Sequence, residues 1–110
     1  MAGKQTAMLK GTLDLLVLRT LELTPLHGVA IADRIKQVTG GTFDVGPGSL
    51  FPALYRLEQE GWVRGAWGES REGRRTRTYT LTAAGRRQLT AERKQWARIV
   101  EAVGQVIDLA

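Results

Sequence analysis

The chain has 110 residues, of which 43% are hydrophobic and 25% are charged, and its formal net charge is +5. This length provides one hydrophobic core, and a chain this short gains stability from forming an oligomer. The absence of cysteine excludes a disulfide framework and a thiolate metal site, and it favours a reducing cytoplasm. No signal peptide or membrane span is expected, because the most apolar run is short and contains charged residues.

The positive charge is concentrated in one part of the chain. Residues 1–63 contain six cations and six anions, whereas residues 64–94 contain nine cations and three glutamates. The excess of positive charge is therefore local, and it favours a polyanionic partner for this segment.

An apolar helix is predicted over residues 8–23, after a small and polar segment 1–7 that we expect to be flexible. Its apolar side chains occupy nearly all sides of the helix instead of one stripe. Such a helix is buried on more than one side, so we expect it to contact both its own domain and a second copy of the chain.

Two further helices are predicted, one over residues 29–39 and one within the stretch 46–61, into which a glycine-proline turn leads. Pro25 ends the first helix, Ser49 is expected to cap the third, and Gly61 ends the third. Three helices joined by short turns are typical of a helix-turn-helix domain, in which the last helix enters the major groove of DNA.

The third helix has two different faces. At about 100° per residue, one face is apolar and consists of Leu50, Ala53, Leu54 and Leu57. The opposite side provides the predicted DNA contacts, which are Ser49, Pro52, Tyr55 and Arg56. Arg56 is the best candidate for bidentate recognition of a base. The alternative is an ordinary amphipathic helix with a solvated polar face.

Residues 62–67 and 75–81 are rich in aromatic and β-branched residues, and a turn-like segment connects them. They predict a β-hairpin that packs on the helices through Trp62, Val63, Tyr79 and Leu81. The predicted fold is therefore mainly α with a small antiparallel β-hairpin, that is, a winged helix-turn-helix followed by a long C-terminal helix.

The hairpin carries a compact group of four arginines, Arg71, Arg74, Arg75 and Arg77. Such a group is suited to phosphates or to a narrow minor groove of DNA. A charged turn that only faces solvent is the alternative. The position of the group directly after a candidate recognition helix favours DNA binding.

The last helix is predicted over residues 83–109, with Thr82 as its cap. Apolar residues recur along it at seven-residue spacing, which is typical of a coiled-coil-like seam. The predicted dimer interface consists of Leu13, Leu16, Leu89, Trp96, Val100, Val103 and Ile107. We therefore expect a DNA-binding domain over residues 8–82 and a dimerisation helix over residues 83–110.

Four motifs occur along the chain, at residues 9–14, 27–28, 48–58 and 73–82, and the third reads Gly-Ser-Leu-Phe-Pro-Ala-Leu-Tyr-Arg-Leu-Glu. In this order and spacing they resemble the short form of the PadR family of bacterial transcriptional regulators. The resemblance covers nearly all of the chain after residue 7. It implies a homodimer that binds a palindromic operator in double-stranded DNA as a repressor.

Two positions differ from the pattern of the family that the chain resembles. The family often has an aromatic residue where Val29 stands, and a tyrosine where Phe51 stands. Neither difference disturbs the expected fold. A hydroxyl contact to DNA from position 51 is, however, absent.

Trp96 lies where the last helix changes from basic to apolar. At a two-fold seam its ring must meet or face its symmetry mate, and two facing indoles form a slot that suits a planar ligand. The context Gln95-Trp96-Ala97-Arg98 is similar to that of multidrug-sensing members of the family, which implies a small planar aromatic or cationic effector. The alternative role of Trp96 is packing between two chains.

Catalytic chemistry has little support in the sequence. His27 is the only histidine and fits a turn better than a metal site, and no catalytic constellation, metal site or cofactor motif is predicted. A protein-binding winged helix without DNA binding is the second hypothesis. The two differ in salt dependence, because contacts to phosphates weaken steeply as ionic strength rises.

Overall fold

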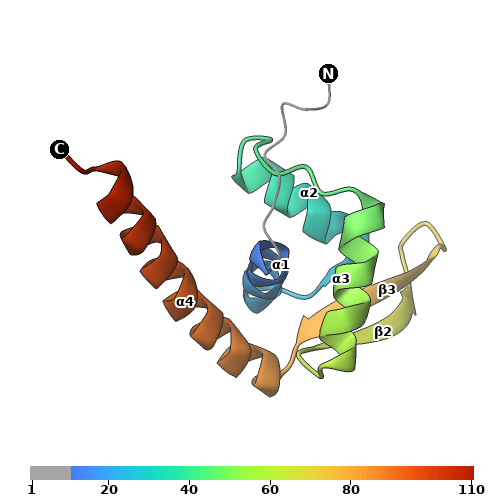
Figure 1. Cartoon of the computed structure of the whole chain (residues 1–110). Helices are drawn as coiled ribbons and strands as arrows, with labels where there is room; N and C mark the ends of the chain where they lie inside the picture. The colour runs from blue at the N-terminus through green and yellow to red at the C-terminus, as the bar shows by residue number, and fades with distance from the viewer. Residues whose placement is uncertain (1–10) are drawn as a thin grey trace.

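The computed structural model describes residues 11–110, which form four helices and three strands (Figure 1). In chain order these are α1 (Thr12–Leu23), β1 (Leu26–His27), α2 (Gly28–Val38), α3 (Pro47–Gln59), β2 (Val63–Glu69), β3 (Arg75–Leu81) and α4 (Ala83–Ile107). The winged helix-turn-helix with a long C-terminal helix is confirmed. The expected flexible segment 1–7, and the predicted start of the first helix at residues 8–10, lie outside the described residues.

The three strands form one antiparallel sheet in the order β1-β3-β2. The sequence predicted β2 and β3, but it assigned β1 to a turn. Leu26 pairs with Tyr79 and His27 pairs with Thr78, so this two-residue strand depends on a partner far along the chain. His27 also caps α2, because its Nδ1 accepts a hydrogen bond from the backbone N–H of Ala30 at 3.3 Å.

The hydrophobic core lies between the helices and one face of the sheet. Its fully buried side chains are Leu18, Ile31, Leu50, Leu54, Leu57, Leu89, Val17 and Val63. Each such side chain contributes about 1.5–3 kcal/mol when it is removed from water. Figure 1 shows α1 between α4 on one side and α2 and α3 on the other, and α1 contacts all three helices and β3. The first helix is thus buried on more than one side by its own chain, and the expected contact with a second copy of the chain stays a prediction.

The start of α3 differs from the prediction. Ser49 was expected to cap the helix, but Gly46 is the N-cap residue and the helix begins at Pro47. Proline suits this first position because its φ is already helical and it has no N–H to satisfy. Ser49 is therefore exposed in the first turn of the helix. Gly61 ends the segment with a φ of +77°, as expected for a left-handed C-terminal position.

The start of α4 is fixed on the turn between α3 and β2. The Thr82 side chain accepts a hydrogen bond from the Gly85 N–H at 3.0 Å and donates one to the Gly61 carbonyl at 2.6 Å. Gly85 is buried against the backbone, since a Cβ placed on it would lie 2.0 Å from the carbonyl oxygen of Trp62. Only glycine therefore allows α4 to approach this closely.

Leu89 lies one helical turn after Gly85, and its surroundings differ from the prediction. Its spacing placed it in the dimer seam, but it is 1% exposed and belongs to the core of its own chain. The helix uses its first turns to close the domain, so Leu89 has no surface left for a second chain. None of the helices in residues 11–110 is both long and apolar enough to cross a membrane.

We predict that Gly85→Ala destabilises the fold by about 1–3 kcal/mol, because the new methyl group would overlap the Trp62 backbone. Gly48→Ala is the matched control. No atom lies within 4 Å of a Cβ at Gly48, so this change should raise stability by up to about 1 kcal/mol. Urea unfolding followed by circular dichroism measures both effects, and equal midpoints would contradict the packing described for Gly85.

Candidate nucleic-acid interface

One side of the molecule combines the free face of α3 with the hairpin formed by β2, β3 and their connecting turn, here called the wing. The two lie side by side in Figure 1 and are in contact. Because its leucines are buried, α3 turns Ser49, Pro52, Tyr55 and Gln59 outward, and all four are exposed. This places three of the predicted DNA contacts, Ser49, Pro52 and Tyr55, on one accessible surface.

Arg56 lies on a different flank of α3. Its guanidinium donates a hydrogen bond to the carboxylate of Asp14 in α1, and the two groups form an ion pair. Arg56 was the strongest sequence candidate for reading a base, but the structure directs it toward α1 instead of straight outward. Its side chain is still 51% exposed, because the ion pair lies at the edge of the domain.

The wing tip is a compact turn stabilised by Ser70. The Ser70 N–H donates to the Arg74 carbonyl at 2.7 Å, and the Ser70 Oγ accepts from the Arg74 N–H at 3.1 Å. The side chains of Arg71 and Arg74 are exposed and have no ion-pair partner among residues 11–110. These two predicted phosphate contacts therefore remain available to a ligand.

Arg75 and Arg77, the other two predicted wing contacts, have different surroundings. The Arg75 guanidinium lies 4.4 Å from the centroid of the Trp67 ring. The Arg77 guanidinium donates to the carboxylate of Glu58, so Arg77 connects the wing to α3. Gly65 makes room for this contact, since a Cβ there would lie 2.4 Å from Arg77 Nε. Arg77 is consequently less available for DNA than its sequence position suggested.

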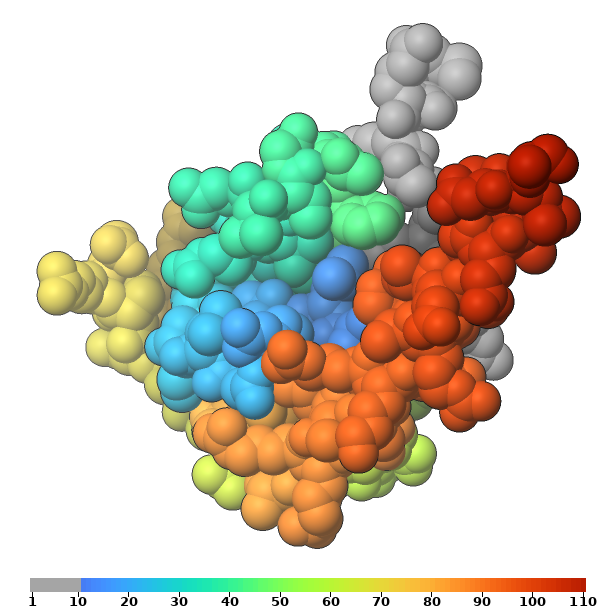
Figure 2. All heavy atoms as spheres, turned by 90° about the vertical axis from the view of Figure 1, so that its left-hand side faces the viewer, coloured from blue at the N-terminus to red at the C-terminus, as the bar shows by residue number. Residues whose placement is uncertain are grey.

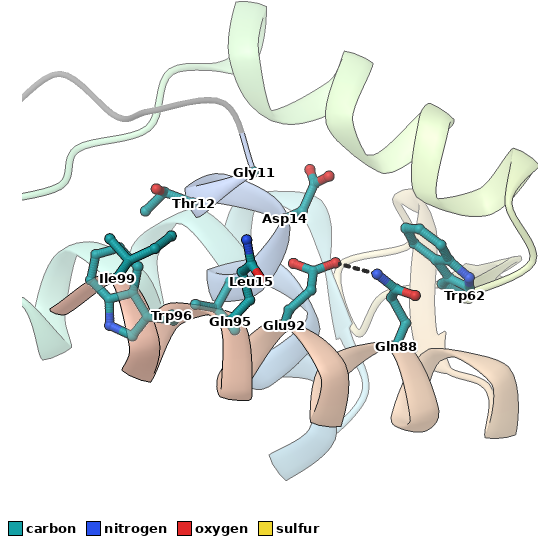
Figure 3. Close-up of a pocket in the computed structure, with 10 residues that line it drawn as sticks. All are labelled: Gly11, Thr12, Asp14, Leu15, Trp62, Gln88, Glu92, Gln95, Trp96 and Ile99. Carbon is teal, nitrogen blue, oxygen red and sulfur yellow. Dashed lines mark hydrogen bonds between the residues drawn. The ribbon is translucent and has the colours of Figure 1, made fainter. Parts of the chain in front are cut away.

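A cavity of about 340 Å³ lies between α1, α4 and Trp62, the residue before β2 (Figure 3). Trp96 and Ile99 border one end of it, and Trp62 borders the other. Glu92 lies between them and accepts a hydrogen bond from Gln88 Nε2 at 3.0 Å. Burial raises the pKa of Glu92 above its usual value, although the hydrogen bond from Gln88 opposes this effect.

The sequence therefore indicated one wall of this cavity, Trp96, and missed the carboxylate. Glu92 had no distinguishing signal along the chain, because it occupies an ordinary position in a polar part of a helix. A helical projection relative to Trp96 could have found it, since residues four apart lie on the same face.

The second half of α4 exposes an apolar surface. It includes Trp96, Val100, Val103 and Ile107 of the predicted dimer interface, together with Ile99 and Val106. Figure 2 shows this helix crossing the face of the molecule, with its C-terminal end projecting at the upper right. Leu13 and Leu16 of α1, also predicted at the interface, are half-buried and pack against the core.

Comparison with known proteins agrees with this architecture. Residues 17–91 match the transcriptional regulator PadR-like family. An uncharacterized 37.1 kDa protein in transposon TN4556 of Streptomyces fradiae is 45% identical over 86 residues, which are 78% of this chain and 23% of that protein. The chain thus spans less than a quarter of this relative's length.

Two solved structures of regulators are also similar. A PadR-like transcriptional regulator from Bacillus cereus is 26% identical, with a TM-score of 0.80 and coverage of 96% of this chain and 100% of that chain. A PadR family transcriptional regulator from Eggerthella lenta is also 26% identical, with a TM-score of 0.80 and coverage of 92% and 86%. With its winged helix, its long last helix and the match over residues 17–91, the chain belongs to the PadR-like family of transcriptional regulators.

Proposed function

We propose that this regulator is a homodimeric repressor that binds a palindromic operator in double-stranded DNA, acts in the cytoplasm, and is released by a small planar aromatic ligand. The observation that carries the proposal is the shared surface of α3 and the wing. An outward polar helix face lies next to a wing tip whose two arginines, Arg71 and Arg74, form no ion pair within residues 11–110. This combination fits the major groove and the adjacent phosphates of one DNA half-site.

The contacts divide into two kinds. Ser49, Pro52 and Tyr55 would face base edges, because α3 presents them when its leucines are buried. Arg71 and Arg74 would bind phosphates and contribute affinity without sequence preference. Arg56 could reach DNA only by exchanging its ion pair with Asp14 for a contact to the nucleic acid.

The dimer is supported by the exposed apolar side of α4. This helix has 25 residues and is about 37 Å long. Six large apolar side chains of its second half are 40–73% exposed, and a group of exposed apolar residues on one helix is typical of an interface between chains. In the proposed dimer this surface packs on α1 and α4 of a second copy. Two recognition helices placed about 34 Å apart would then enter successive major grooves.

The ligand site is supported by the cavity beside Trp96. Its indole provides a flat apolar wall, while Glu92 provides a carboxylate whose pKa is raised by burial. A planar aromatic ligand with a positive charge would stack on the indole and pair with the carboxylate. Asp14 borders the same cavity and also holds Arg56 of α3, so a ligand there touches a partner of the recognition helix.

We predict that Arg74→Ala weakens binding to all duplex sequences alike and lowers the slope of log affinity against log salt by about 0.9. Arg87→Ala removes an exposed charge from the start of α4 and should leave the slope unchanged. Fluorescence anisotropy at several salt concentrations measures both.

Sequencing of duplexes selected from a random pool should return a palindrome. Salt-independent binding to other proteins, with no DNA retained, would instead support the protein-binding alternative.

We predict that Val103→Glu raises the dissociation constant of the dimer at least about tenfold, because it places a charge in an apolar seam. Gln105→Glu is the matched control, since it adds the same charge on the opposite side of α4. Sedimentation equilibrium gives both constants. A Val103→Glu protein that dimerises as tightly as the control would exclude this seam.

We predict that planar cationic dyes quench tryptophan fluorescence saturably and that Trp96→Ala abolishes dye binding, with Trp67, which does not line the cavity, as background. Glu92→Gln should weaken a cationic dye about fivefold and leave a neutral planar dye unaffected. Because the pKa of Glu92 is raised, cationic dye binding should weaken as the pH falls through that raised pKa. Equally tight dye binding in Trp96→Ala would show that Trp96 is not part of the ligand site and would support a role in dimer packing alone.

A further inference from the structure

The face of the wing that covers the core continues outward as a line of aromatic and guanidinium groups. In the register of β2 and β3, Val63 pairs with Leu81, Gly65 with Tyr79, Trp67 with Arg77 and Glu69 with Arg75. Side chains two residues apart lie on the same face of a strand, so all these residues share one face. The buried pair at the base is thus followed by Tyr79, Arg77, Trp67 and Arg75 toward the tip.

These four side chains are stacked. The Arg77 guanidinium lies 5.9 Å from the Tyr79 ring centroid and 5.4 Å from that of Trp67, and the Arg75 guanidinium lies 4.4 Å from Trp67. Each distance is within the range of a cation–π contact. Trp67 is therefore shared by two arginines, although it is 56% exposed. A large exposed aromatic group on a hairpin is not explained by packing of the core.

The two arginines of the stack differ in whether they also form an ion pair. Arg77 is bonded to Glu58, so its charge is already neutralised by α3. Arg75 lies opposite Glu69 in the register, but it forms no ion pair within residues 11–110. Its guanidinium is held by the Trp67 ring, and its hydrogen-bond donors remain free for a planar, bidentate partner such as a phosphate.

We propose that Trp67 is a positioning residue for DNA binding, which holds Arg75 in place for a backbone phosphate and connects it through Arg77 and Glu58 to α3. This inference rests on the proposed DNA binding. An arginine side chain loses much of its rotamer entropy when a ligand immobilises it. A guanidinium that is already stacked on an indole has lost part of that freedom before DNA binds. Its further ordering on DNA therefore reduces the binding free energy less.

The test measures affinity for random-sequence duplex DNA over a range of salt concentrations. Trp67→Ala should weaken binding roughly three- to tenfold with little change in salt slope, because the number of cations is unchanged. Trp67→Phe should restore most of the affinity. Arg75→Ala should lower the slope by about 0.9. Adding Trp67→Ala to Arg75→Ala should then weaken binding much less than Trp67→Ala does alone, because Arg75 is gone and Arg77 is already paired with Glu58.

Arg64→Ala is the control, since it removes an exposed cation from β2 on the face opposite Trp67. The effects of Arg64→Ala and Trp67→Ala should add. Additivity of Trp67→Ala with Arg75→Ala, or an unchanged affinity in Trp67→Ala, would overturn the positioning role.

A second measurement is independent of DNA. Amide hydrogen exchange in β2 and β3 near the tip should accelerate in Trp67→Ala, because the stack no longer stiffens the wing. Unchanged exchange would overturn the inference even if DNA binds. The two measurements also distinguish failure of the proposed function from failure of the stack. If the wild-type protein binds no duplex DNA, the proposed function and the DNA role of Trp67 are both wrong. Faster exchange in Trp67→Ala would still show that the stack stiffens the wing.

Discussion

The burial of one side of α3 is the constraint on which the candidate interface depends. Leu50, Leu54 and Leu57 are all but inaccessible to water, and the helix contacts α1, α2 and β2 through this side. A helix whose buried side is packed against three other elements cannot rotate without opening the core. The opposite face, with Tyr55 at its centre, must therefore point away from the domain, and the wing lies beside it.

The helices and the hairpin could be predicted because each follows a local pattern. Apolar residues three and four apart mark one side of α3, and alternation marks β2 and β3. Thr82 was also identified correctly as the cap of α4. The missed features are β1, which is only two residues long, and the helix start at Pro47, where proline made a side-chain cap unnecessary.

The partners of the charged side chains could not be predicted, because they depend on distant parts of the chain. Arg56 and Asp14 are 42 residues apart, and Arg77 and Glu58 are 19 residues apart. The position of Trp67 opposite Arg77 is different, since it follows from the hairpin register once Val63 and Leu81 are taken as the inward pair. The heptad spacing that included Leu89 could not distinguish packing within a chain from packing between chains.

In the proposed dimer, α4 would connect the seam between the two chains to the proposed DNA-binding surface. Its first turns are locked onto the Trp62 backbone through Gly85, and its second half carries the exposed apolar side chains. The helix is continuous from Ala83 to Ile107, so a shift at the seam would move the attached winged domain as a rigid body. A ligand near Trp96 could then change the separation of two recognition helices. The free energy available for this change equals the difference between the ligand's binding free energies for the two arrangements.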